Sequence, residues 1–164
     1  MPDNELNKIA YDFFLVFSRM EYALKVSGFN NGDGVAKANW YKFATHQDIE
    51  NFIANPPTTE ISEAIDYIIG NPPMRQSVKN NILGWETVVP DTKSNADKLF
   101  QYIRRVRNNL FHGGKFNGNW FEPQRSESLI KNSLIILHAV IKCEPTINDA
   151  YNDDDGKFTG ELIP

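Results

Sequence analysis

Cysteine and long apolar runs are scarce in this chain of 164 residues. The single cysteine, Cys143, excludes an internal disulfide and is typical of a reducing compartment. Polar or charged residues interrupt every apolar stretch well before the length of about 18 residues that a membrane-spanning helix needs. The N-terminus has no basic start followed by an apolar run, so we expect no signal peptide. These features predict a soluble cytoplasmic protein with no membrane partner.

Patterns that bind metals or cofactors are also missing. His46 and His138 have no partner at ligand spacing, so the sequence predicts no zinc site. The run 153–156 superficially resembles a calcium loop, but Tyr151 and Leu162 stand where carboxylates are required. Glycine-rich phosphate loops of the Walker or Rossmann type are absent from the sequence. We therefore expect neither a metal nor a cofactor.

Basic residues are fewer than acidic ones: the chain has 17 Lys and Arg and 21 Asp and Glu, which gives a net charge of −4. This balance argues against a general nucleic-acid coat protein, which needs a basic surface. The cations are nevertheless uneven, and one group lies close together in the sequence: Lys98, Arg104, Arg105, Arg107, Lys115 and Arg125. A local basic site on an acidic body permits selective contact with RNA.

Apolar spacing of three and four residues predicts helices through most of the chain. The expected helices cover residues 5–27, 46–54, 59–69, 94–111 and 126–143. The first of them carries more apolar surface than one buried stripe requires, which favours packing on two sides and a contact with a second subunit. Ser94 and Asp97 have the spacing of a capping box at the start of the fourth helix.

The expected fold class is all-α, an up-and-down four-helix bundle with additional short helices. Residues 1–145 form the single predicted domain, and residues 146–164 form an acidic C-terminal tail that we expect to be loosely held. Residues 74–93 are the hardest to assign, with a short extended piece over 85–89. The aromatic segment 40–43 fits packing beneath a loop better than stacking on bases.

The motif Arg107-Asn108-Asn109-Leu110-Phe111-His112 is the most informative part of the sequence. Arg can grip a phosphate through two parallel hydrogen bonds, and His can exchange a proton near neutral pH. On an ideal helix the two side chains lie roughly 140° apart, whereas Asn108 and His112 share a face. Gly113 favours a left-handed helix end, which would turn His112 away from the helix axis.

Together these residues predict metal-independent cleavage of RNA. A base removes the proton of a 2′-hydroxyl, which attacks the adjacent phosphate and expels the 5′-oxygen. His112 is the candidate for proton transfer, and Arg107 the candidate for stabilising the charged transition state. The other interpretation is an ordinary helix end, at which the Arg is solvated and the His caps a carbonyl.

The segment Arg-Asn-x-x-x-His at the end of a long helix resembles the HEPN superfamily (higher eukaryotes and prokaryotes nucleotide-binding), whose hallmark is Arg-x(4–6)-His. Residues 17–25 and 39–44 further resemble a prokaryotic branch of stand-alone HEPN proteins. This resemblance implies a ribonuclease acting as a toxin or in defence against phage. It also implies a homodimer with two Arg–His motifs across one cleft, and an antitoxin protein as a partner. Gly114 stands where one toxin–antitoxin branch has a modified tyrosine, which puts that form of regulation in doubt.

Five further residues are candidates for the site. Glu21 either forms an ion pair that orients Arg107 or pairs with Lys25 on the helix surface, and both alternatives stay open. Arg104, Asn109 and Lys115 are candidate contacts to RNA phosphates, and Asn108 is the candidate to orient the His112 ring. We thus predict an endoribonuclease with a composite site in a homodimer; the alternative is an inactive HEPN-like module that binds RNA or nucleotides or only dimerises.

Overall fold

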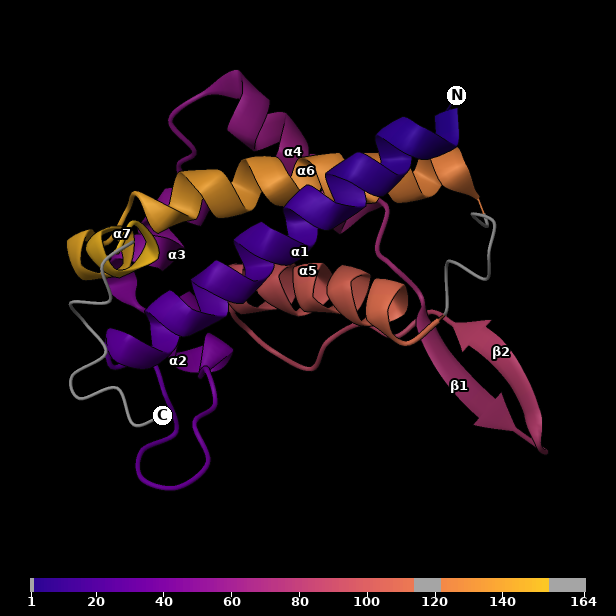
Figure 1. Cartoon of the computed structure of the whole chain (residues 1–164), viewed down its shortest axis with the longest axis horizontal. Helices are drawn as coiled ribbons and strands as arrows, with labels where there is room; N and C mark the ends of the chain where they lie inside the picture. Colours follow the sequence, from indigo (N-terminus) through magenta and orange to yellow (C-terminus); the bar gives the residue numbers. More distant parts are fainter. Residues whose placement is uncertain (1, 114–121, 154–164) are drawn as a thin grey trace.

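The computed structural model describes residues 2–113 and 122–153 of the chain and is mostly helical (Figure 1). Its helices are α1 (Pro2–Val26), α2 (Trp40–Ala44), α3 (Gln47–Ala54), α4 (Thr59–Gly70), α5 (Asn95–Phe111), α6 (Pro123–Ile141) and α7 (Pro145–Tyr151). The strands β1 (Arg75–Lys79) and β2 (Ile82–Glu86) form one antiparallel hairpin. The predominance of helix confirms the coarse expectation of a helical protein.

The long helices pack against one another around a continuous apolar core. α1 lies along α6, α6 also packs on α4, and α5 contacts α1, α2, α3 and α4 (Figure 1). Six residues along one face of α6 are all buried: Leu129, Ser133, Ile136, Leu137, Val140 and Ile141. Periodic apolar spacing therefore located the buried faces correctly, because each helix has to cover its apolar stripe to fold.

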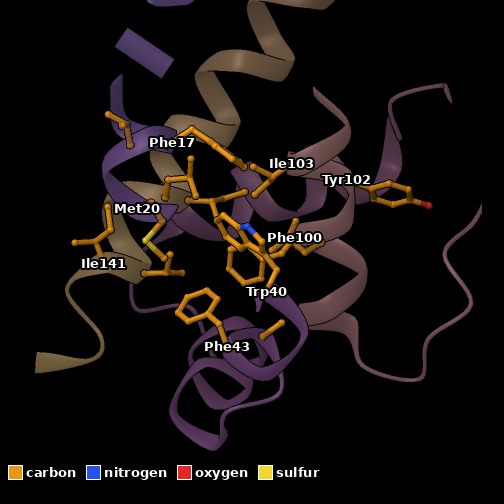
Figure 2. Packing of buried hydrophobic residues seen from close by; sticks show 14 of the residues in the cluster. Phe17, Met20, Trp40, Phe43, Phe100, Tyr102, Ile103 and Ile141 are labelled. Atoms are coloured by element: carbon orange, nitrogen blue, oxygen red, sulfur yellow. The ribbon is translucent and has the colours of Figure 1, made fainter. Parts of the chain in front are cut away.

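An aromatic cluster joins α1, α2 and α5 near the centre of this core (Figure 2). The Trp40 ring stacks on Phe17 with centroids 5.2 Å apart, and Phe43 meets Phe100 edge-on at the same centroid distance of 5.2 Å. Trp40 is only 3% exposed. The packing interpretation of segment 40–43 is thus confirmed for Trp40 and Phe43, while Tyr41 projects outward.

The N-terminus of α5 bears out one half of the expected capping box. The Ser94 hydroxyl accepts a hydrogen bond from the backbone N–H of Asp97 at 3.1 Å. The reciprocal half is replaced, because the Asp97 carboxylate accepts from the Gln101 amide at 2.8 Å and the Ser94 N–H donates to the Thr92 hydroxyl. The helix therefore begins where the sequence indicates, and Asp97 is tied one turn further along it.

The hairpin is the main departure from the predicted helical fold. Of the extended piece expected at 85–89, only residues 85 and 86 lie in a strand, the five-residue β2, which pairs with β1 from Arg75 opposite Glu86 to Lys79 opposite Ile82. Asn80 and Asn81 connect the strands with φ angles of 51° and 62°, the positive values that a two-residue type I′ turn requires. The hairpin projects from the helical body at the end where α5 finishes (Figure 1).

The predicted tail begins too early, since residues 145–151 form helix α7 and pack on α1. Ile147 and Ala150 of this helix are buried, and the Arg19 guanidinium lies 5.2 Å from the centroid of the Tyr151 ring. The Glu144 carboxylate caps α7 by accepting from the N–H of Ile147. Part of the predicted tail thus belongs to the folded unit; residues 154–164 lie outside the described residues. Among the described helices, none has the length and apolar character needed to cross a membrane.

The aromatic cluster should contribute strongly to stability. Phe100 is fully buried among Trp40 and Phe43, so Phe100→Ala leaves a cavity and should lower the free energy of unfolding by about 3–5 kcal/mol in urea titrations. Tyr41→Ala removes a ring that is 63% exposed and should change the free energy of unfolding by only about 0.5 kcal/mol. Equal losses in the two variants would contradict the placement of the core.

Candidate functional site

One face of α5 forms a groove together with the hairpin. Gln101, the adjacent Arg104 and Arg105, Asn108 and His112 recur about once per turn, so they lie on the same side of the helix. Asn109 also lines this groove, and Arg75 and Gln76 of β1 line its other side. The groove has a volume of about 360 Å³ and is open to solvent.

Hydrogen-bond donors dominate the walls of this groove. Three arginines, one histidine and four side-chain amides line it, and among the described residues its lining includes no carboxylate. Such a lining attracts anions, although the chain as a whole carries a net charge of −4. Arg, Asn, Gln and protonated His all offer N–H groups in this space.

His112 lines the groove and caps the C-terminus of α5. Its backbone N–H donates to the Asn108 carbonyl at 2.9 Å, and its side chain is exposed. Gly113 follows with a φ of +75°, which confirms the predicted left-handed helix end. Asn108 and His112 both line the groove, but no hydrogen bond between their side chains occurs within the described part of the chain.

Arg107 lies on a different side of α5 and faces α1. Its guanidinium is 4.9 Å from the centroid of the Phe17 ring, and its terminal nitrogen is 3.6 Å from Oε1 of Glu21. The same carboxylate oxygen accepts a hydrogen bond of 2.9 Å from the Trp40 indole. Glu21 therefore pairs with Arg107, the first of its two predicted partners, and residues 2–113 show no ion pair between Glu21 and Lys25.

Arg104 occupies the groove one turn before Asn108. Burial lowers the pKa of its guanidinium, and the nearby Glu21 carboxylate raises it, so the two effects oppose each other. Arg stays charged at any working pH. Its Nε is buried and has no hydrogen-bond partner among the described residues, while the partly exposed side chain lines the groove.

Asn109 has a structural role that differs from the predicted phosphate contact. Its side chain is 8% exposed and donates to the Met74 carbonyl at 2.9 Å. Arg105 donates to the carbonyls of Pro73 at 3.1 Å and Val88 at 2.8 Å. These contacts attach both ends of the hairpin to α5, and the side-chain amide of Asn109 is therefore committed to the backbone. The third predicted phosphate contact, Lys115, lies outside the described residues.

Sequence reasoning missed Arg75, Gln76 and Gln101 as residues of the groove. Gln101 carried a local signal, because it lies seven residues before Asn108 and so on the same helix face. Arg75 and Gln76 carried none, since they reach the groove only through the contacts that attach the hairpin to α5.

No family model, curated protein or solved structure matches this chain significantly. The HEPN resemblance therefore stays a prediction drawn from the Arg107–His112 motif. In the described ranges, no three His, Cys, Asp or Glu side chains converge in a way that could hold a metal ion.

The two neighbouring asparagines offer a matched test of the Asn109 assignment. Asn109→Ala leaves the Met74 carbonyl without its donor and should lower the free energy of unfolding by about 1–3 kcal/mol in urea titrations. Asn108→Ala removes an exposed side chain from the same helix, and its expected change is about 0.5 kcal/mol or less. The structural role is wrong if the two variants are equally stable.

Proposed function

We propose that the protein is a metal-independent endoribonuclease of the HEPN type, acting as a toxin or in defence against phage. The observation that carries this proposal is a groove that includes His112 and whose described lining residues include no carboxylate. An RNA phosphate is attracted to its arginines, and a histidine in its lining can exchange a proton with the sugar. An antitoxin partner stays a prediction from the family resemblance.

The proposed reaction is a transesterification within the RNA strand. A His112 imidazole takes the proton of a 2′-hydroxyl, the 2′-oxygen forms a bond to the adjacent phosphorus, and the bond from phosphorus to the 5′-oxygen breaks. A second proton donor protonates the departing 5′-oxygen, so the products carry a 2′,3′-cyclic phosphate and a 5′-hydroxyl. Arg107 stabilises the additional negative charge on the phosphoryl oxygens in the transition state.

A composite site from two chains is part of the proposal, because Arg107 and His112 do not share one surface in a single chain. Arg107 is held against α1 by Glu21 and Phe17, whereas His112 lines the groove. A second chain can bring its own Arg107 to the groove of the first chain, beside the first chain's His112. The reverse pairing then forms in the groove of the second chain.

An exposed aromatic surface beside the site supports this dimer. Four apolar side chains form it, with exposures of 61%, 39%, 41% and 50% for Tyr11, Phe14, Leu15 and Phe111. The Phe14 and Phe111 rings lie 5.2 Å apart and join α1 to the end of α5. Apolar side chains grouped in this way favour association, and Phe111 immediately precedes His112.

The packing of α1, α4, α5 and α6 supports the finer fold proposal, an up-and-down four-helix bundle of the HEPN kind. The proposed domain covers residues 1–145 together with α7. In this arrangement the Arg107–His112 segment ends one long helix, and the hairpin and the short helices are additions to the four-helix bundle.

A non-catalytic RNA-binding or dimerising module is the alternative. The separation of Arg107 from His112 within one chain favours it, because such a chain has a cationic groove and no complete catalytic pair. Binding without cleavage requires only the groove, whereas cleavage requires both residues in one place.

Cleavage of a single-stranded RNA in EDTA distinguishes these two functions. We expect the natural chain to cut RNA and to leave 2′,3′-cyclic phosphate ends, and both Arg107→Ala and His112→Ala to lower the rate about 100-fold or more. His138→Ala is the matched control, because it removes an exposed histidine from α6 and should not change the rate. Intact RNA with the natural chain, or equal rates in all variants, would rule out the enzyme.

The dimer is testable through the exposed aromatic surface. Phe14→Glu places a charge at the proposed contact and should convert a dimer to a monomer in light scattering, with the helical circular dichroism unchanged. Val35→Glu changes a side chain that is 81% exposed in a loop after α1 and should leave the dimer intact. A natural chain that is monomeric at all concentrations would contradict the composite site.

A further inference from the structure

We propose that the hairpin is the second wall of an RNA-binding groove, in which Arg75 of β1 and Arg104 of α5 hold the phosphates of a single strand. This inference rests on the proposed substrate class, RNA, and adds an element that the Arg107–His112 motif does not contain. It assigns substrate binding to the hairpin, which the sequence alone leaves without a role.

Arg75 is placed to bind an anion from the hairpin side. Its side chain is 56% exposed and lines the groove, while two of its nitrogens donate to one oxygen of Glu86. Lys79 contacts the other oxygen of that carboxylate at 3.1 Å. Hydrogen bonds from Arg75, and then from Lys79, lower the pKa of Glu86, so this carboxylate stays ionised and fixes the direction of the Arg75 fork. The Arg75 guanidinium has further N–H groups for a phosphate.

Arg104 faces the same groove from the helix side. Its side chain is partly buried and lines the groove, and this burial lowers the pKa of its guanidinium. A desolvated cation gains more from an arriving phosphate than an exposed one does, because less water screens the interaction. Arg104 and Arg75 thus provide cationic donors on opposite walls.

The two walls keep a fixed separation because polar contacts attach the hairpin to the helices. Arg105 bridges the carbonyls of Pro73 and Val88, which flank the hairpin on its two sides. Arg125 of α6 donates to the Pro72 carbonyl at 3.0 Å, next to the Arg105 contact. A preformed groove loses less conformational entropy on binding than a loop that orders around its ligand.

The dimensions and lining of the groove favour a single strand over a duplex. Its volume of about 360 Å³ is near the lower end of small-molecule sites, which run from roughly 300 to 1,000 Å³. Proteins that bind double-stranded RNA instead span about 16 base pairs. Gln76, Gln101 and Asn108 line the groove between the arginines, and amides can pair with the edges of unstacked bases.

Binding of an uncleavable strand tests this inference separately from catalysis. The probe is a fluorescein-labelled 2′-O-methyl RNA of about 12 nucleotides, within the usual site sizes of single-strand binders. It has no free 2′-hydroxyl, so fluorescence anisotropy reports binding alone. We expect Arg75→Ala and Arg104→Ala each to weaken binding about fivefold to tenfold, and to reduce the slope of log affinity against log salt by about 0.7.

Lys79→Ala is the matched control for Arg75→Ala. Both variants remove a cation that contacts Glu86 on the same hairpin, but only Arg75 lines the groove. We expect Lys79→Ala to change affinity by less than about twofold. Thermal unfolding of each variant checks the fold, and Arg104→Lys, which keeps the charge, should retain more affinity than Arg104→Ala.

Three results would overturn the inference: no binding of the strand by the natural chain, equal weakening by Arg75→Ala and Lys79→Ala, or equally tight binding of a blunt RNA duplex. If Arg75→Ala and Arg104→Ala both bind and cleave RNA as the natural chain does, the groove is rejected and the proposed function stands. Binding that depends on Arg75 and Arg104, without any cleavage in EDTA, would support the groove and reject the proposed ribonuclease.

Discussion

The helical repeat of α5 is the constraint on which the rest of the site depends. Because five residues separate Arg107 from His112, the helix directs one toward α1 and the other into the groove. The Glu21 carboxylate and the Phe17 ring stabilise the Arg107 side chain there. We therefore propose a catalytic centre that takes Arg107 from one chain and His112 from another.

The second constraint is the attachment of the hairpin to the helical body. A two-stranded hairpin is marginally stable by itself, and this one exposes much of its apolar surface. Its ends are fixed by the donors of Arg105 and Asn109, which satisfy the carbonyls of Pro73, Met74 and Val88. The same face of α5 therefore has two roles. Arg105 and Asn109 position the hairpin, and Arg104 and His112 line the groove between α5 and the hairpin.

Sequence patterns correctly predicted the features that depend on neighbouring residues, namely the positions and ends of the long helices. Apolar spacing located α1 and α5 because each helix buries a stripe set by its own sequence, and Ser94 and Gly113 marked the two ends of α5. The hairpin and the role of Asn109 could not be predicted in this way. They depend on side-chain contacts to carbonyls 17 to 35 residues away in the chain, such as that from Asn109 to Met74, and no spacing in the sequence records such contacts.

Complementation between two inactive variants tests the central claim most directly. Arg107→Ala and His112→Ala chains would be purified separately, mixed under conditions that let subunits exchange, and assayed for RNA cleavage in EDTA. The composite site predicts that activity returns on mixing, because one cleft of the hybrid dimer contains an intact Arg107 from one chain and an intact His112 from the other. A mixture that exchanges subunits but stays as inactive as its two components would contradict the account.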